Sequence, residues 1–366
     1  MKQIHIKLSD QLHHDLRLEC AKLDTCIQDY VSELLFKNLK NSNTKDLLSE
    51  EKCQFNFIDL FSGVGGIRLP FQELGGKCVF SSEIDKFAKQ TYQAFYGDLP
   101  EGDITLIDPL TIPDFNILLA GFPCQPFSQA GQRKGFDDTR GTMFFYIEEI
   151  LRIKKPQAFL LENVKGLKGH DKGNTFKVIC NHLENLGYKL NYQVLAAKDF
   201  GLPQNRERIY IVGFLNHEHA EKFNFPTPLN IPTRVGDILE NNVAHKYTIS
   251  DKLWQGHQRR KLEHKTKGNG FGYSMFNNES QYTNTISARY NKDGSEILID
   301  QGEGKNPRKI TPLEAARLQG FPDELVIKAR EAGVSDAQLY KQFGNSVAVN
   351  VIREIAKKMH EAMTMN

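Results

Sequence analysis

The chain has 366 residues, a formal net charge of +2 and an apolar content of 40%. This composition excludes a collagen-like or largely disordered chain and leaves enough apolar side chains for a sizeable core. No apolar run approaches the roughly 18–20 residues that a membrane span requires. The six cysteines show no Cys-x-x-Cys spacing, so we expect no metal site and a reduced, cytoplasmic setting.

Residues 1–48 form the first predicted unit. Ile4 and Ile6 alternate with polar residues, as in a short strand with one polar face, and two stretches with helical apolar spacing follow. This order resembles a ribbon–helix–helix module, which pairs two strands across a dimer and lays them in the major groove of DNA. We therefore expect a homodimer through this segment, with a role as a DNA-binding autoregulator as a second function. The alternative is a helical extension packed on the main domain.

From residue 53 the pattern changes to short apolar runs separated by helix-forming stretches. This alternation predicts a mostly parallel, doubly wound α/β sheet, whose ligands bind at the carboxyl ends of the strands. An amphipathic helix is expected at Val347–Met363. The predicted strands are Phe55–Phe61, Lys77–Ser82, Phe115–Gly121, Gln157–Leu161 and Arg208–Phe214.

The regular alternation stops near residue 230, which predicts a smaller, irregular domain with its hinge at 230–339. The α/β domain then comprises 53–229 and 340–366. From 246 to 309 the chain has 12 Lys and Arg against 7 Asp and Glu, a net +5, whereas the remaining 35 basic and 38 acidic residues give −3. Six of these basic residues lie in Lys252–Lys267. Such a surface suits contacts with phosphates, and the alternative is a solvated charge run.

A glycine-rich turn, Gly63-Val64-Gly65-Gly66, follows the first predicted strand. Its spacing departs from the dinucleotide fingerprint because Arg68 occupies the sixth position, which disfavours a pyrophosphate ligand. Glu83 follows the first glycine by 20 residues, where an acid can reach ribose hydroxyls, and Asp103 could hold an adenine amino group. We interpret the loop as a site for a nucleoside cofactor without phosphates. A tight turn without a ligand is the alternative.

Two further motifs carry chemically reactive groups. Cys124 lies between two prolines directly after an apolar strand, and a thiolate is a strong nucleophile once its pKa is lowered. Glu162 ends another apolar strand, where burial would raise its pKa and suit it to donate a proton. Arg206 and Arg208 precede the next strand and could contact a carbonyl or a phosphate. The alternatives are a capping or surface acid and an ordinary salt-bridged strand entry.

Together these motifs resemble the DNA (cytosine-5) methyltransferases, most closely those of bacterial restriction–modification systems. The resemblance implies a Rossmann-like methyltransferase fold that uses S-adenosylmethionine, with 230–339 as target-recognition domain and hinge. It also implies double-stranded DNA as substrate and a cognate restriction endonuclease as partner. The blocks that carry it are Asp59–Gly66, Pro123-Cys124-Gln125, Glu162-Asn163-Val164, Gln204–Arg208, Pro312–Pro322 and Gln342–Val347.

The resemblance also implies a role for each site residue. Cys124 would add to C6 of a flipped-out cytosine, Glu162 would hold N3, and Arg208, assisted by Arg206, would contact O2. Phe61 would stack on adenine and Glu83 would bind the ribose. The remaining cofactor residues would be Gly63, Gly65, Ile84, Asp103, Ile104, Pro123 and Asn345.

Contacts with DNA are expected from two loops. Gln125 and Arg140 belong to the loop after the nucleophile, which would close over the DNA. The second loop contains a Thr-Ile-Ser-Ala sequence like the recognition-loop landmark of the family, with Asn284, Thr285 and Arg289 as DNA contacts. The tRNA-methylating branch is a disfavoured alternative, because its Cys-Phe-Thr signature is absent after Cys180, the last cysteine.

Overall fold

The computed structural model describes residues 54–123, 143–270 and 272–364. Cys124, Gln125, Arg140 and the module predicted at 1–48 lie outside these residues. The chain divides into Met1–Cys53 and Gln54–Asn366, and the second unit is described below. No helix in the described ranges is long and apolar enough to cross a membrane.

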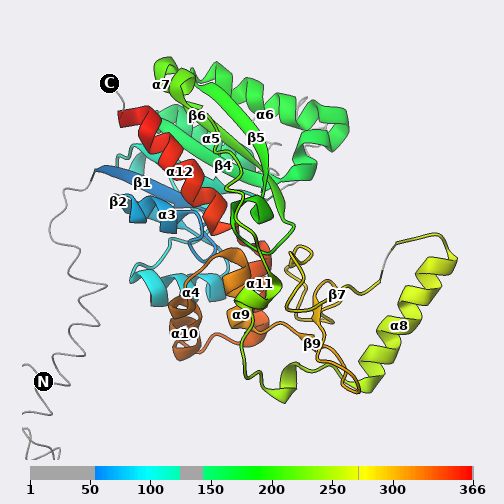
Figure 1. Cartoon of the computed structure of the whole chain (residues 1–366). Helices are drawn as coiled ribbons and strands as arrows, with labels where there is room; N and C mark the ends of the chain where they lie inside the picture. The colour runs from blue at the N-terminus through cyan, green and yellow to red at the C-terminus, as the bar shows by residue number, and fades with distance from the viewer. Residues whose placement is uncertain (1–53, 124–142, 271, 365–366) are drawn as a thin grey trace, which may run out of the picture. The chain divides into compact units, whose positions relative to one another are not determined.

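A six-stranded sheet with the order β2-β1-β3-β4-β6-β5 forms the centre of this unit (Figure 1). The first four strands are parallel, whereas β6 runs antiparallel to both β4 and β5. This arrangement confirms the predicted α/β fold. The strands are β1 (Phe55–Leu60), β2 (Gly76–Ser82), β3 (Ile117–Gly121), β4 (Ala158–Val164), β5 (Lys189–Ala196) and β6 (Glu207–Phe214).

Two strands differ from their prediction. The sequence analysis missed β5, because this edge strand is only partly buried and carries polar residues along most of its length. β4 continues past the predicted end at Leu161, because β6 pairs with it as far as Val164. Glu162 therefore lies within a hydrogen-bonded strand, where its backbone position is well defined.

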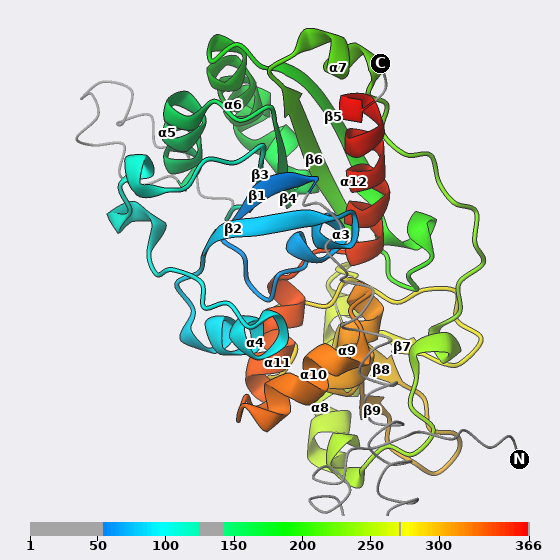
Figure 2. The same cartoon turned by 90° about the vertical axis from the view of Figure 1, so that its left-hand side faces the viewer.

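Helices cover both faces of the sheet (Figure 2), which explains why the central strands are continuously apolar. In β3, Leu119 packs in the core with α3 (Arg68–Glu73), α7 (His217–Lys222) and α12 (Val349–Thr364). Its neighbour Leu118 packs on the opposite face with α5 (Met143–Lys154) and α6 (Asn174–Asn185). The amphipathic helix predicted at the end of the chain is confirmed as α12. Val351, Ile352, Ile355 and Met359, which lie on its apolar face, are all buried.

A third core lies between the sheet and the irregular region. It contains apolar residues of α9 (Pro312–Gln319), α10 (Asp323–Glu331) and α11 (Asp336–Asn345), which also contact α4 (Lys86–Tyr96) or one another. The irregular region itself has α8 (Asp251–Thr266) and a small sheet of β7 (Met275–Phe276), β8 (Leu298–Ile299) and β9 (Arg308–Lys309). The short 3-10 segments are η1 (Ile104–Leu106), η2 (Pro109–Thr111), η5 (Lys165–Gly173), η6 (Ala197–Phe200), η7 (Val235–Ile238) and η8 (His245–Tyr247).

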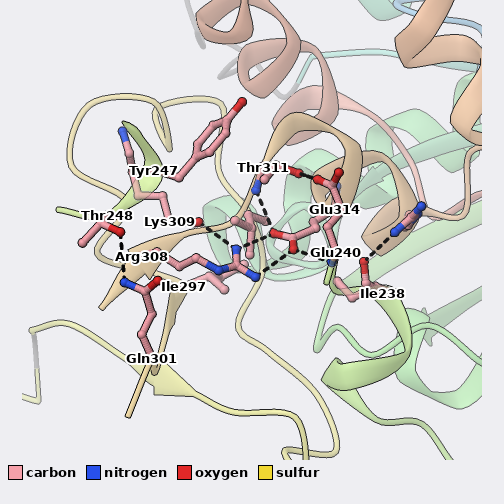
Figure 3. A network of polar contacts seen from close by, with 12 residues as sticks. Ile238, Glu240, Tyr247, Thr248, Ile297, Gln301, Arg308, Lys309, Thr311 and Glu314 are labelled. Atoms are coloured by element: carbon pink, nitrogen blue, oxygen red, sulfur yellow. Dashed lines mark hydrogen bonds and ion pairs between the residues drawn. The ribbon is translucent and has the colours of Figure 1, made fainter. Parts of the chain in front are cut away.

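A buried carboxylate connects this region to α9 (Figure 3). Glu314, which is 0% exposed, accepts hydrogen bonds from both terminal nitrogens of Arg308 at 2.7 and 2.8 Å. It also accepts from the backbone N–H groups of Thr311 and Glu240, each at 2.8 Å. The Thr311 hydroxyl in turn accepts from the N–H of Glu314, which completes a capping box at the start of α9. One side chain thus connects β9, α9 and the segment that leads into the irregular region.

We expect Arg308→Leu to lower the free energy of unfolding by about 3–5 kcal/mol, because it leaves Glu314 buried without its cation. Urea unfolding of the full chain measures this change. Arg260→Leu is the matched control, because it breaks an exposed 3.2 Å ion pair with Asp293 and should change stability by less than about 1 kcal/mol. Equal losses in the two variants would contradict a special role for the buried pair.

Candidate active site

The glycine-rich turn after β1 reverses the chain through three residues in the left-handed region. Phe61, Gly63 and Gly65 have φ angles of +52°, +54° and +77°. The turn is held by hydrogen bonds from Ser62 N–H to the Ser82 carbonyl at 2.9 Å and from Gly65 N–H to the Ser62 carbonyl at 2.7 Å. A Cβ at Gly63 would meet no atom within 4 Å. The turn therefore presents open space on its outer side, as a ligand cradle requires.

Glu83 joins this turn to the end of β2. Its carboxylate accepts from Gly63 N–H at 2.8 Å and from Asp85 N–H at 2.7 Å. Each carboxylate oxygen retains a lone pair, so the side chain can still accept a hydroxyl group. The structure thus brings together two residues that the sequence assigned to one cofactor.

Asp103 and Ile104, which were predicted to bind the cofactor, lie beside Glu83. The Glu83 N–H donates to the Glu101 carbonyl at 3.0 Å, which brings the segment containing Asp103 and Ile104 to the end of β2. Asp103 caps η1 by accepting from Thr105 N–H, and Ile104 is buried. Ile84 is 72% exposed, so an apolar surface is available at this place.

Pro123 and Asn345 both lie at this carboxyl edge of the sheet. Pro123 follows β3 and is exposed, and Asn345 is the exposed last residue of α11. The segment after Asn345 packs against the glycine turn, because a Cβ at Gly66 would be 2.9 Å from Val347 and 3.0 Å from the Ser346 hydroxyl. The first and last predicted blocks are therefore in contact.

An ion pair between Glu162 and Arg208 lies at the same edge. Arg208 Nε is 3.2 Å from Glu162 Oε1, and the two side chains are only 15% and 10% exposed. Burial raises the pKa of Glu162, whereas Arg208 and Arg206 oppose this rise. Gly121, the last residue of β3, is the register partner of Glu162 and leads directly towards the predicted nucleophile loop.

Arg206, which was predicted to contact a carbonyl or a phosphate and to assist Arg208, donates to backbone carbonyls in the structure. Its terminal nitrogens donate to the carbonyls of Ile286 at 3.4 Å and Gly344 at 3.3 Å, and also to the carbonyl of Ser346. Burial, together with the neighbouring Arg208, lowers its pKa to about 9. The guanidinium thus holds two distant loops to the start of β6, so its contacts are structural in kind.

Sequence reasoning missed the role of Gln204, which is fully buried beside Arg206. Its amide nitrogen donates to the Leu318 carbonyl at 3.0 Å, and its oxygen accepts from Ile286 N–H at 3.0 Å. A Cβ at Gly344 would lie 2.3 Å from the backbone of the Ser287–Ala288 segment, so the two segments of the chain are in direct contact. Gln204 and Gly344 belong to the sequence blocks Gln204–Arg208 and Gln342–Val347. Only their contacts in the structure show that they hold the predicted recognition loop in place.

The three DNA-contact residues predicted in that loop are not equivalent. Asn284 donates to the Ser274 hydroxyl at 2.8 Å and to the Glu296 carbonyl at 3.2 Å. Thr285 donates to the Asn205 carbonyl at 2.7 Å. The Arg289 side chain is exposed, and its guanidinium has no hydrogen-bond or ion-pair partner among the described residues. Arg289 is therefore the one of the three that keeps its full donor set for a ligand.

Comparisons with known proteins agree with this geometry. Residues 55–361 match the model of the C-5 cytosine-specific DNA methylase family. The chain belongs to this family. It is a DNA (cytosine-5) methyltransferase, and its fold carries the family's motifs at the carboxyl edge of the sheet.

Among its relatives, the type II methyltransferase M.NlaX of Neisseria lactamica is 66% identical over 85% of this chain and 97% of that protein. M.SsoII of Shigella sonnei is 62% identical over 85% of this chain and 81% of that protein. The solved structure of the Entamoeba histolytica methyltransferase EhMeth has a TM-score of 0.70, at 22% identity over 85% of this chain and 99% of that chain. This last likeness shows the fold.

Proposed function

We propose that this methyltransferase modifies C5 of a cytosine within a specific sequence of double-stranded DNA, with S-adenosylmethionine as methyl donor. The observation that carries the proposal is the buried Glu162–Arg208 pair beside the end of β3, at the edge where the cofactor loop also lies. We further propose that it acts in the cytoplasm and protects DNA from a cognate restriction endonuclease. Dimerisation and autoregulation through residues 1–48 stay predictions, because this segment lies outside the described residues.

The residues at the glycine turn fit S-adenosylmethionine. Glu83 would offer carboxylate lone pairs to ribose hydroxyls, Asp103 would hold the adenine edge, and Ile84 would offer its exposed apolar surface to the ring. Arg68, at the position where the dinucleotide fingerprint has glycine, faces away into the protein and is buried. When bound, this cofactor supplies a methyl group that is activated by its positively charged sulfur.

Catalysis by this chain would begin with a thiolate. Cytosine C5 becomes nucleophilic only after a group adds to C6 and opens the C5–C6 double bond, and we assign this addition to Cys124. Once C5 carries the methyl group, a base removes the C5 proton and the Cys124 thiolate leaves C6, which restores the double bond. Addition places negative charge on the ring, which a proton or hydrogen bond at N3 relieves. Glu162 suits this role because burial raises the pKa of its carboxyl and so favours the protonated form. Arg208, held against Glu162, would contact the cytosine O2 from the same side.

We expect Cys124→Ser to abolish methyl transfer while it leaves cofactor affinity within about twofold, because the alcohol is a far weaker nucleophile than the thiolate. Incorporation of labelled methyl groups into DNA, together with calorimetry of cofactor binding, measures both effects. Cys180→Ser in α6 is the control and should remain active. Full activity of Cys124→Ser would overturn the mechanism.

Bisulfite sequencing of DNA from expressing cells would show which cytosines are modified, and no modification would overturn the function.

For Glu162→Gln we expect kcat to fall by about 10²–10⁴-fold, because the amide cannot transfer a proton to N3. The affinity for DNA should change much less, since the amide keeps the size and hydrogen-bonding capacity of the side chain. Single-turnover methylation and DNA titration separate the two effects. Parallel losses in rate and affinity would instead indicate that Glu162 only supports the structure.

We also propose that α8 binds the phosphate backbone of the DNA. Figure 1 shows this helix on the side of the irregular region away from the six-stranded sheet. His257 is its only buried residue, and Trp254 packs edge-on against Tyr273 at 4.7 Å between ring centroids. Lys252, Lys265 and Lys267 are exposed and have no ion-pair partner among the described residues.

Replacing Lys252 and Lys265 of α8 and Lys267 directly after it by glutamine should reduce the slope of log affinity against log salt by up to about 2.7, at about 0.9 per lost phosphate contact. DNA titrations at several salt concentrations measure this slope. The matched control replaces Lys357 and Lys358 by glutamine. Both lysines lie in α12, away from α8, and already pair with Glu354 and Glu361 of the same helix. An unchanged slope in the α8 variant would exclude this helix from the DNA interface.

A further inference from the structure

Tyr96, the last residue of α4, contacts the glycine turn at a different residue from Glu83. Its hydroxyl donates a hydrogen bond to the Gly65 carbonyl at 2.7 Å. Two side chains therefore bind the backbone of the turn, because the Gly63 N–H donates to Glu83 and the Gly65 carbonyl accepts from Tyr96. These two bonds define which backbone groups face the open side of the turn.

The contact requires both glycine at 65 and a tyrosine at 96. A Cβ on Gly65 would lie 2.3 Å from the Tyr96 ring, and the φ of +77° already disfavours any other residue. The absence of a side chain thus lets the ring lie directly under the turn. A phenylalanine at 96 would fill the same space but leave the Gly65 carbonyl without this partner.

Arg68 holds the Tyr96 ring in place. Its guanidinium carbon lies 4.2 Å from the Tyr96 ring centroid, within the range of a cation–π contact. All three guanidinium nitrogens are in use, because Nε donates to Gln72 at 2.8 Å, Nη1 donates to the Tyr92 hydroxyl at 3.0 Å and Nη2 lies 2.7 Å from Asp98. Arg68, which replaces the last glycine of the dinucleotide fingerprint, is therefore fully engaged by side chains that pack around the turn.

We propose that Tyr96, held by Arg68, is a positioning residue that sets the cofactor-binding conformation of the glycine turn. This inference rests on the proposed function, because it takes the turn to be the S-adenosylmethionine site. Tyr96 touches the Gly65 backbone and acts on the cofactor through it. The Gly65 carbonyl also accepts from Leu69 N–H at 3.1 Å, so loss of the Tyr96 hydroxyl removes the shorter of its two hydrogen bonds and makes other conformations of the turn more accessible.

The test compares two identical substitutions on one helix in the full-length protein. Tyr96→Phe removes the hydroxyl that contacts the turn, whereas Tyr92→Phe removes a hydroxyl whose hydrogen-bond partners among the described residues are Arg68 and, at 3.9 Å, Cys78. The two rings lie 4.8 Å apart between centroids, so both variants change the same cluster. Calorimetry measures the Kd of S-adenosylmethionine and of its demethylated product, and methylation kinetics separate KM from kcat.

We expect Tyr96→Phe to raise the cofactor Kd and KM by roughly 5- to 30-fold, with kcat at saturating cofactor and DNA affinity within about twofold of wild type. Tyr92→Phe should change the cofactor Kd less than twofold. An unchanged Kd in Tyr96→Phe, or equal increases in both variants, would overturn the proposal even if the thermal midpoint falls. Failure of the wild-type protein to bind S-adenosylmethionine would instead overturn the proposed cofactor itself, and the positioning role with it.

Discussion

The buried polar groups at the start of β6 are the constraint on which the functional parts of this enzyme depend. Backbone N–H and carbonyl groups in a core must be hydrogen-bonded, and here they come from segments far apart in the chain. Gln204 satisfies the groups of Ile286 and Leu318, and Arg206 satisfies the carbonyls of Ile286 and Gly344. Two adjacent side chains thereby place the recognition loop, α9 and the end of α11 relative to the sheet.

This constraint links the predicted recognition loop and the predicted catalytic pair to one strand. Arg208, two residues after Arg206 on β6, forms the ion pair with Glu162 on β4. A displacement of the recognition loop would therefore be transmitted to the pair through a few covalent bonds. On the other side of the site, the segment after α11 packs on Gly66 of the cofactor turn. The loop at 344–347 contacts both the glycine turn and the predicted recognition loop. This loop therefore brings the residues predicted for cofactor binding, catalysis and sequence recognition close together.

The sequence predicted the elements whose burial is complete and whose neighbours are local. The apolar runs of β1, β3 and β4 follow from burial on both faces, and α12 follows from its single apolar face. The edge strand β5 escaped prediction because half-exposed polar strands lack such a pattern. The spacing of Arg206 from Arg208 is visible in the sequence, whereas the carbonyls that Arg206 binds lie 80 and 138 residues further along the chain.

The sequence by itself determined the kind of chemistry, because a thiol, a carboxyl group and a glycine-rich turn are properties of residues and of their order. Only the tertiary structure decided which polar side chains are available to a ligand and which are already bound within the protein. The Asn284 side chain donates to Ser274 and the Thr285 hydroxyl to the Asn205 carbonyl, whereas the Arg289 guanidinium has no such partner among the described residues. Arg68 looked like a defect in a ligand-binding motif, but it is engaged beneath the cofactor turn. The physical reason is that a polar group's availability depends on partners brought to it by folding, and spacing along the chain does not encode them.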